Sequence, residues 1–527
     1  MGAGELVMPA AGASVLLWLL ATSLVPAGVI FVLPERAERT RRAVNMAGAI
    51  AKVALVVVLV LGVFSGREYE WRAPFLPGID LVLRADPVPL LFVFLSALLW
   101  LTTTVYAIGY LSEDTHRSRF FGFFSLCVTA SVGIALAGNL VTLLVFYELL
   151  TVTTYPLIVH QGHERARAGG RIYLLYAVTG GAAVLVGVVW LQTIAGTVAF
   201  RETALLAALL PEHRGALTAI FALLVAGFGV KAAIVPLHVW LPHAMVAPAP
   251  VSALLHAVAV VKAGAYAIVR VIHDLYGATL ATDLGVLTPL AVAAAITIVY
   301  GSVLALAQQD LKRRLAYSTV SQLSYIVLGV SVVGLTSVTG GVAHLVHQGV
   351  MKVTLFYCAG ILATSLGVTR VDQLHGIARQ RPLTMTAFTV AALGMIGVPP
   401  TVGFITKWHL GLGAVEAGQP WVIGILVAST LLNAAYFLPL IARAWLAEPD
   451  GEVVGRPVGV PHPRRARGRV RPARLGPRRL RLEADPWLLL PPLATSASVL
   501  VLGVFAGAPL SPISWAEDIA RELLGRL

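Results

Sequence analysis

Fourteen windows of about 20 mostly apolar residues recur along this chain, and each is long enough to cross a lipid bilayer as an α-helix. Of the 527 residues, 58% are hydrophobic and only 12% are charged, which leaves too little polar surface to coat a soluble protein of this size. The sequence therefore predicts an all-α polytopic membrane protein with about 14 transmembrane helices. The windows lie near 13–34, 43–64, 88–110, 119–137, 139–159, 172–196, 216–243, 250–276, 285–307, 316–335, 338–365, 383–413, 420–442 and 487–507.

Basic residues are distributed unevenly between alternate loops. With the amino terminus placed outside, the inner loops contain 26 Lys and Arg, whereas the outer loops and the carboxyl tail contain seven. Because positively charged loops stay on the cytoplasmic side, we expect a multi-pass protein of a bacterial inner membrane with both termini outside. No basic residue precedes the first window, so we expect that helix to be retained rather than cleaved as a signal peptide.

The seventh and twelfth windows are longer than a crossing requires, and both contain prolines, Pro236 and Pro242 in one and Pro399 and Pro400 in the other. Prolines at comparable depth, five windows apart, predict two inverted five-helix repeats whose helices 7 and 12 are broken. Ordinary proline kinks are the alternative. The predicted units are N-terminal helices 1–3 at 1–118, a first repeat at 119–276, a second repeat at 277–442, an Arg/Pro-rich inner loop at 443–486, and a last helix with an interfacial tail at 487–527.

The formal net charge of +13 comes largely from ten arginines between residues 456 and 481. No aromatic-rich basic face or nucleic-acid motif accompanies them, so we expect contact with anionic lipid or a partner subunit and none with nucleic acid. Asp310, Lys312 and Arg314 follow the ninth window and are expected to be a solvated anchor. In the tail, Ser514 is expected to cap a short interfacial helix.

Cys127 and Cys358 stand alone in separate windows, without Cys or His at metal-ligand spacing, and no catalytic motif occurs. We therefore expect no metal site, no cofactor and no catalytic site in this chain. Any redox cofactor would belong to a partner.

Five of the six lysines lie inside the apolar windows, whereas nearly all of the 33 arginines lie in loops. A buried lysine can release its proton, but an arginine retains it. We therefore predict a proton path that uses Lys231, Lys262, Lys352 and Lys407. Lys52 has no acid or proline break near it in the sequence, and we place it outside this path.

Glu148 is the one acidic residue of 26 that lies in the middle of a window. An isolated charge in a membrane costs at least ~2.5 kcal/mol, so a partner is expected. Lys231 is the expected partner, and movement of the carboxylate toward a competing cation would make the pair a switch. A fixed ion pair that joins two helices is the alternative.

The windows that contain Lys231, Lys262 and Lys352 also contain four histidines of interest: His238, His256, His344 and His347. Because histidine titrates near neutral pH, we predict proton relay through His238, His256 and His347. His344, at i−3 from His347, is equally suited to relay and to packing, and hydrogen-bonded packing is the alternative for the others too. Lys407 would be the terminal group of the path, and a lysine that reaches the membrane surface is its alternative.

Five stretches that carry these residues resemble the antiporter-like subunit family shared by respiratory complex I, membrane-bound hydrogenases and Mrp-type multisubunit antiporters. They are FYELLT, GVKAAIVPLHVWLPHAMVAPAPVSALLHAVAVVKAGAY, DLKRRLAYSTVSQLSY, HLVHQGVMKVTLFYCAG and GVPPTVGFITKW. The resemblance implies two inverted five-helix repeats. It also implies that Glu148 and Lys231 form the input pair of the proton path, that Lys262 and the histidines form its middle, and that Lys407 is its output.

Within that family, GFITKWHLGLGAVEAG resembles most the D subunit of Mrp antiporters or its hydrogenase relative. The resemblance implies the proton-translocating subunit of a multisubunit monovalent cation (Na⁺)/H⁺ antiporter. Its partners would be other membrane subunits, protons, Na⁺ and the lipid bilayer. A proton-pumping subunit of NADH-quinone oxidoreductase or of a membrane-bound hydrogenase is the alternative, although complex I subunits of the M type usually carry glutamate where Lys407 stands. The sequence leaves open the cation, the stoichiometry, the direction and the role of the Arg-rich loop.

Overall fold

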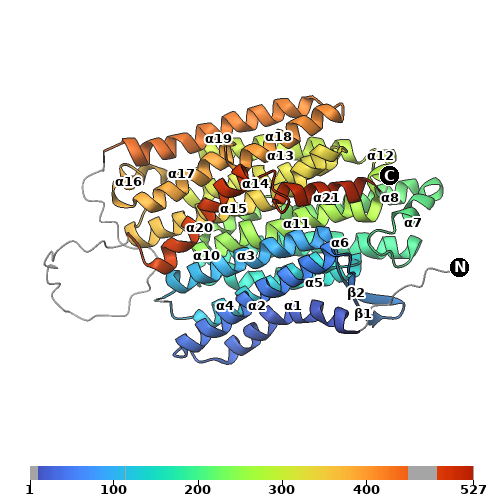
Figure 1. The fold of residues 1–527 in the computed structure, drawn as a ribbon, viewed down its shortest axis with the longest axis horizontal. Helices are drawn as coiled ribbons and strands as arrows, with labels where there is room; N and C mark the ends of the chain where they lie inside the picture. Colours follow the sequence, from blue (N-terminus) through green and yellow to red (C-terminus); the bar gives the residue numbers. More distant parts are fainter. Residues whose placement is uncertain (1–9, 113, 449–482, 526–527) are drawn as a thin grey trace.

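The computed structural model describes residues 10–112, 114–448 and 483–525. Its helices lie side by side along the long axis of the molecule (Figure 1). Within these residues, twelve helices are long and apolar enough to cross a membrane, and the chain is a multi-pass membrane protein. Most of the Arg/Pro-rich loop, including the ten arginines between 456 and 481, lies outside the described residues.

Four helices begin the chain, and they pack on one another in pairs. Between the second and third, β1 (Tyr69–Leu76) and β2 (Ile79–Ala85) form an antiparallel hairpin that the sequence analysis did not predict. Gly78 in its turn has a φ of +75°, a conformation that glycine adopts at no steric cost. The helices are α1 (Ala10–Val32), α2 (Glu38–Phe64), α3 (Pro87–Tyr110) and α4 (Arg117–Leu136).

The next segment contains the first predicted break. The helix that carries Lys231 ends at Ala232, and helical structure resumes at Trp240. After the break, the eighth window folds as short α and π segments, with His256 inside a π segment. The elements are α5 (Leu140–Ile158), α6 (Glu164–Ala195), α7 (Thr203–Ala208), α8 (Leu210–Ala232), α9 (Trp240–His243), η1 (Ala244–Val246), α10 (Ala249–Ala253), η2 (Leu254–Val258), α11 (Val260–Val269) and η3 (Arg270–Tyr276).

The remaining segment contains the second predicted break, between Ile396 and Val402. Each break contains one cis peptide bond, at Val235–Pro236 and at Pro399–Pro400. The elements are α12 (Ala278–Asp283), α13 (Leu287–Ala307), α14 (Leu311–Ser331), α15 (Leu335–Leu366), η4 (Val371–Gln373), α16 (Ile377–Gln380), α17 (Pro382–Ile396), α18 (Val402–Glu416), α19 (Trp421–Leu446), α20 (Pro486–Val504) and α21 (Pro512–Leu524).

Each of the fourteen predicted windows coincides with one or more of these helices. Two windows are not among the twelve spans: α14 begins with charged residues and is polar, and the twelfth window is divided into two 15-residue helices. The count of fourteen crossings and the inverted repeats therefore remain predictions.

The short carboxyl-terminal helix begins earlier than predicted. Its cap is Ser511, whose hydroxyl accepts a hydrogen bond from the main-chain N–H of Ser514. Pro512 explains the difference, because proline favours the first position after a cap. The side chains of Trp515, Ile519 and Leu523 are buried, and α21 packs on α15 and α3, so this face binds protein rather than lipid alone.

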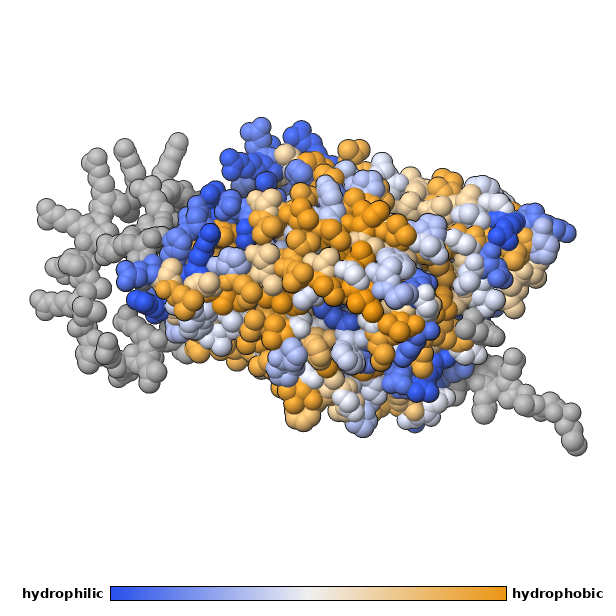
Figure 2. Space-filling view, turned by 90° about the horizontal axis from the view of Figure 1, so that it is seen from above, coloured by the Kyte–Doolittle hydropathy of each residue, from blue (hydrophilic) through white to orange (hydrophobic). Residues whose placement is uncertain are grey.

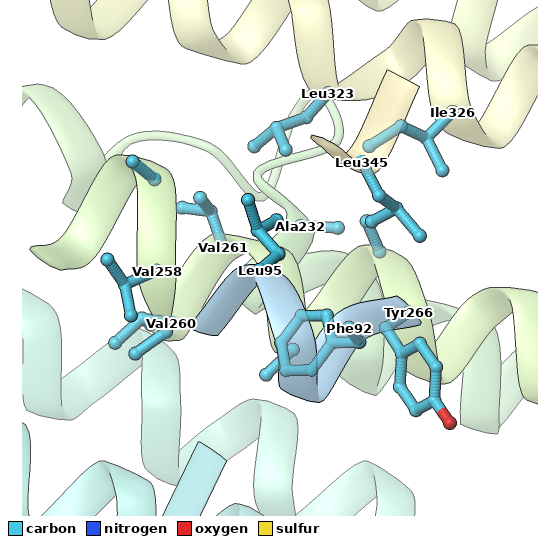
Figure 3. Packing of buried hydrophobic residues seen from close by; sticks show 14 of the residues in the cluster. Phe92, Leu95, Ala232, Val258, Val260, Val261, Tyr266, Leu323, Ile326 and Leu345 are labelled. Atoms are coloured by element: carbon cyan, nitrogen blue, oxygen red, sulfur yellow. The ribbon is translucent and has the colours of Figure 1, made fainter. Parts of the chain in front are cut away.

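Burial separates central helices from peripheral ones. All of the apolar window in Ala249–Tyr276 is buried, against 33% for α2 and 39% for α6. Figure 3 shows apolar side chains of the central helices in contact, with the rings of Phe92 and Tyr266 facing each other at a centroid distance of 5.0 Å. Hydrophobic residues cover the middle of the surface seen in Figure 2, and hydrophilic residues gather toward the two ends. The central helices carry most of the predicted path.

Candidate functional site

Glu148 and Lys231 lie on neighbouring elements, but they do not form an ion pair. The Lys231 ammonium is fully buried, donates a hydrogen bond to the main-chain oxygen of Tyr147, and lies 3.4 Å from the centroid of the Tyr147 ring. Glu148 makes no hydrogen bond or ion pair to any described residue, and its Oε1 atom is buried without a partner.

Gly181 on α6 makes room for the Glu148 carboxylate. A Cβ atom at this position would collide with Oε1 of Glu148. The neighbouring Gly180 similarly allows α6 to approach Val230 on α8. The two glycines therefore bring α5, α6 and α8 together around the carboxylate.

The first break exposes main-chain groups that side chains satisfy. Trp240 donates its indole N–H to the oxygen of Val230 across the break, 2.7 Å away, and Thr297 on α13 accepts from the N–H of Val235 at 3.1 Å. His238 lies within the break, with its ring 5.3 Å from that of Tyr300. Its Nδ1 atom is buried without a hydrogen-bond partner among the described residues.

Lys262 connects α11 with α15. Its fully buried ammonium donates to the main-chain oxygen of Leu345 on α15. Gly349, one turn further along α15, leaves space for the ammonium. His256, fully buried one turn before α11, stacks on Phe356 of α15 with a centroid distance of 4.6 Å, and neither of its ring nitrogens has a partner among the described residues.

Helix α15 runs without interruption past its predicted relay groups. His347 forms a hydrogen bond of 2.7 Å from Nδ1 to the Thr406 hydroxyl on α18, and its Nε2 atom is unpartnered among the described residues. Lys352 donates to the Ser318 hydroxyl and, at 3.1 Å, to the main-chain oxygen of Leu315 on α14. Both ring nitrogens of His344 are buried without a hydrogen-bond partner in the part of the chain that the structure describes, and the ring lies beside that of Tyr325.

Lys407 turns inward rather than toward the membrane surface. Its ammonium donates to the oxygen of Ile396 at 2.6 Å and to the Thr430 hydroxyl on α19 at 2.9 Å. The Ile396 oxygen is available because α17 ends there, and Gly397 follows with a φ of +91°. The adjacent Trp408 is 60% exposed and points away from the interior.

Lys312 and Arg314 are not the solvated anchor that the sequence suggested. The Lys312 ammonium donates to the oxygen of Ala247, in the connection that follows the first break, at 2.5 Å. Arg314 is only 5% exposed and donates to the oxygens of three residues, Leu306, Gln308 and Tyr436. Asp310 caps α14 by accepting from the N–H of Arg313. The motif instead fixes the start of α14 against neighbouring segments.

All six lysines of this chain make the same kind of hydrogen bond. Each of the six donates to a main-chain oxygen outside its own helix, and the four path lysines thereby connect α8 with α5, α11 with α15, α15 with α14, and α18 with α17. No path lysine forms an ion pair among the described residues. Within the same part of the chain, no group of three or more His, Cys, Asp or Glu is placed to hold a metal ion.

Sequence patterns did not indicate the neutral side chains that position the charged ones. Tyr147, Thr406, Thr430 and Ser318 each contact a path residue. Tyr147 had a detectable signal, because it directly precedes Glu148. The others had none, since hydroxyl residues are common in membrane helices, where they bond to neighbouring turns or helices.

Residues 137–433 match the family model described as NADH:quinone oxidoreductase/Mrp antiporter, transmembrane region. The N subunit of the NADH-quinone oxidoreductase of Desulforudis audaxviator is 40% identical over 468 residues, which cover 87% of this chain and 88% of that protein. A protein of Rhizobium meliloti described as the A/B component of a probable K⁺/H⁺ antiporter is 32% identical over 78% of this chain, which spans only 42% of that relative.

A solved structure of similar fold is a chain of the Mrp complex from a Dietzia species. It superposes with a TM-score of 0.83 at 26% identity, and the match covers 98% of both chains. The similarity therefore extends well beyond the 297 residues of the family match, over helices at both ends of this chain.

Proposed function

Because this chain belongs to the NADH:quinone oxidoreductase/Mrp antiporter transmembrane family, we propose that it carries protons through the membrane as one subunit of a multisubunit complex. The proposed path begins at Glu148 and Lys231, passes Lys262 and Lys352, and ends at Lys407. His238, His256 and His347 relay protons between the lysines.

The observation that carries this proposal is the set of lysines hydrogen-bonded to neutral main-chain oxygens. A carboxylate in contact with a lysine would hold the proton on it, whereas a carbonyl exerts no such charge. A lysine that has lost its proton still has N–H groups to donate, so the hydrogen bond survives the transfer. Each lysine can therefore change its charge without losing its place between two helices.

Glu148 supplies the one mobile negative charge of the path. When its carboxylate approaches Lys231, the positive form of that lysine is favoured, and when it moves away, the proton can pass onward. Gly181 leaves the space that Oε1 occupies, because a Cβ atom at this position would collide with it.

We propose an antiporter for monovalent cations as the first assignment of the complex. The likeness to a chain of an Mrp complex over 98% of both chains supports it, as does the relative described as part of a probable K⁺/H⁺ antiporter. In this assignment, Na⁺ or K⁺ is exchanged for the protons, and partner subunits complete the path.

A redox complex is the second candidate, in which this subunit pumps protons while electron transfer occurs elsewhere. The identity of 40% to an N subunit of NADH-quinone oxidoreductase, over nearly nine-tenths of both chains, favours it. Purification of the intact complex through a tag on this chain separates the two candidates. Flavin fluorescence and iron–sulfur absorption in the pure complex would identify a redox enzyme, and cation-dependent proton exchange without these cofactors would identify an antiporter.

The proton path itself is tested in everted membrane vesicles that contain the complex. Glu148→Gln and Lys231→Ala are expected to abolish proton transport, although the amount of assembled complex stays normal. Glu416→Gln is the matched control, because Glu416 is exposed at the end of α18. Transport at the wild-type rate in either path variant would contradict the proposed path under both assignments.

A further inference from the structure

The first four helices enclose a row of buried polar side chains that the proposed path does not use. All six are at most 3% exposed, and they come from all four helices. Figure 1 shows that α1 and α2 lie at the edge of the molecule, beside α3 and α4. We call this row the polar seam, and it consists of Ser23, Asn45, Lys52, Thr104, Ser125 and Thr129.

Hydrogen bonds connect the seam across the helices. Asn45 on α2 accepts from the Ser125 hydroxyl at 3.0 Å and donates to the Thr104 hydroxyl at 3.4 Å. One turn further along α4, the Thr129 hydroxyl lies 2.7 Å from that of Ser23 on α1 and donates to the main-chain oxygen of Ser125. Hydroxyl and amide groups both donate and accept hydrogen bonds, so the hydrogen bonds along the polar seam can point in either direction.

Lys52 forms the inner end of the seam. Its fully buried ammonium donates to the oxygen of Leu19 at 2.8 Å, and Ser23 donates to the next oxygen along α1, that of Leu20. Trp100 on α3 has its ring centroid 5.6 Å from the ammonium. Lys52 is therefore held within the helix bundle and does not reach toward the membrane surface.

The other end of the seam lies toward the side of the membrane where α1 connects to the arginine-bearing start of α2. A small, partly open surface pocket lies there, lined by Arg41, Arg42, Arg117, Glu38, Ile108 and Phe121. Arg41 donates to the Ser118 hydroxyl on α4 at 3.2 Å, and Asn45 follows one turn deeper on α2. Polar side chains therefore lie at successive depths between this pocket and Lys52.

Beyond Lys52 the same face of α2 becomes apolar. Its buried residues toward the opposite side of the membrane are Val56, Leu59 and Gly62. On α2 itself, the polar side chains of the seam therefore lie on the arginine-bearing side of Lys52.

No negative charge faces Lys52 from any helix packed against it. Within their bounds, α1 and α3 contain no Asp, Glu, Lys, Arg or His, and α4 contains only Arg117 and Arg119, in its first turn. The other charged residues of α2 are Glu38, Arg39, Arg41 and Arg42, nearly three turns or more from Lys52. A buried ammonium without a counter-ion is costly, so binding and release of a proton is the change that this site can make most readily.

We propose that Lys52 is a second intramembrane proton-binding site, outside the main path, which is loaded and emptied through the polar seam from the arginine-bearing side. Hydronium at the arginine-bearing side gives its proton to the neutral amine of Lys52, so that one O–H bond breaks, one N–H bond forms and water is left. The reverse step empties the site by the same route.

The position of α3 gives this site an influence on the main path. Trp100 faces Lys52, whereas the preceding residue, Leu99, lies against Gly349 on α15. A Cβ atom at Gly349 would be 3.3 Å from a Leu99 methyl carbon and 3.2 Å from the ammonium of Lys262. Lys52 and Lys262 therefore lie on opposite sides of α3. A positive charge on one of them makes a positive charge on the other less favourable, because the protein interior between them has a low dielectric constant. This last step rests on the proposed function, but proton binding at Lys52 does not.

Nuclear magnetic resonance of the ¹⁵N-lysine-labelled full chain, inserted in one orientation in liposomes, tests the proposal. Only six lysine Nζ signals are expected, and the signal lost in Lys52→Met identifies Lys52. Between about pH 6 and 10, the Lys52 signal is expected to change between the ammonium and amine forms when pH is varied on the arginine-bearing side alone. Variation on the opposite side alone should leave it unchanged.

Two seam variants and one control complete the test. Asn45→Leu should abolish the response of the Lys52 signal, and the milder Ser125→Ala should weaken it if Asn45→Leu fails to insert. Val56→Leu, one turn beyond Lys52 on the same face, should leave the response intact. A Lys52 signal that stays in one form at every pH, that follows pH on the opposite side, or that responds normally in both seam variants would overturn the proposal. Because the test measures no transport, its failure would leave the proposed path untouched.

Discussion

The ammonium of Lys231 lies 3.4 Å from the centroid of the Tyr147 ring and donates to the main-chain oxygen of the same residue. The Tyr147 hydroxyl donates to the oxygen of Gly227 at 2.9 Å, one turn before Lys231. A single tyrosine thus fixes the last turn of α8 beside Glu148. A cation held over an aromatic ring away from water gains about 2 kcal/mol, enough to determine where the ammonium rests.

The effect of a Tyr147 substitution on proton transport should therefore depend on whether the whole ring or only the hydroxyl is removed. Tyr147→Leu removes the ring and is expected to slow transport at least about tenfold, since 1.4 kcal/mol corresponds to a factor of about ten. Tyr147→Phe keeps the ring and loses only the hydroxyl bond, so it should retain most of the activity. Proton uptake by everted vesicles, divided by the amount of assembled complex, measures both. Equal rates in the two variants would show that the ring contact has no role.

Gly181→Ala should impair transport without preventing assembly. The added Cβ occupies the space that the Glu148 carboxylate uses, so the carboxylate must shift and its approach to Lys231 changes. Gly424→Ala on α19 is the control, because a Cβ there meets nothing within 4 Å. The same vesicle assay should give a several-fold lower rate for Gly181→Ala and the wild-type rate for Gly424→Ala. An unimpaired Gly181→Ala would mean that the carboxylate does not need this space.

The sequence identified the helices and both breaks because these depend on local properties. An apolar window predicts a membrane helix by length alone, and Pro236 and Pro399–Pro400 interrupt their helices through the missing N–H and the bulk of the ring. The predicted lysines also occupy the interior, since a charged residue inside an apolar window must find a polar partner somewhere.

The identity of each partner could not be predicted, because it depends on contacts between residues far apart in the chain. Lys262 bonds to Leu345 and Lys231 to Tyr147, each more than 80 positions away, and any carbonyl could have served. The second window is apolar apart from Asn45 and Lys52, so it did not show which face of α2 is buried, and Lys52 could not be placed between α1 and α3.

Thr406→Val should slow transport by removing the hydrogen bond that orients His347. The Thr406 hydroxyl bonds Nδ1 at 2.7 Å, which fixes which ring nitrogen can carry a proton to the rest of the path. Thr364→Val is the matched control, because the Thr364 hydroxyl bonds only to oxygens of its own helix. A rate reduced about threefold to tenfold in Thr406→Val alone is expected, since a hydrogen bond contributes about 1 kcal/mol. Equal rates in both variants would remove Thr406 from the site.

Asp114 should make the stability of the complex depend on pH in the acid range. Burial alone would raise the pKa of this carboxyl, but hydrogen bonds from the His160 ring and the His116 N–H outweigh it and hold the pKa below its ordinary value of 3.8. Because the pKa is lower in the folded state, the stabilisation is complete above 3.8 and is lost as pH falls through the folded value. Thermal unfolding of Asp114→Asn should therefore occur at a lower temperature than that of the wild type at neutral pH, with a difference that shrinks on acidification. A difference independent of pH would contradict this assignment.

Lys407 provides the sharpest distinction between a proton carrier and a structural contact. Its ammonium joins the Ile396 oxygen at the end of α17 to the Thr430 hydroxyl on α19, so the side chain is also placed to stabilise the second break. Lys407→Arg can preserve these hydrogen bonds and the positive charge, but a guanidinium does not release its proton. If Lys407 passes protons, Lys407→Arg should lose nearly all transport while its thermal stability remains close to that of the wild type. Thr430→Val, which removes one acceptor and leaves the lysine free to titrate, should keep most of the transport. Proton uptake and unfolding temperature are measured on the same preparations. If the Lys407→Arg complex transported protons normally, Lys407 would be only a contact between helices, and the proposed path would not include it.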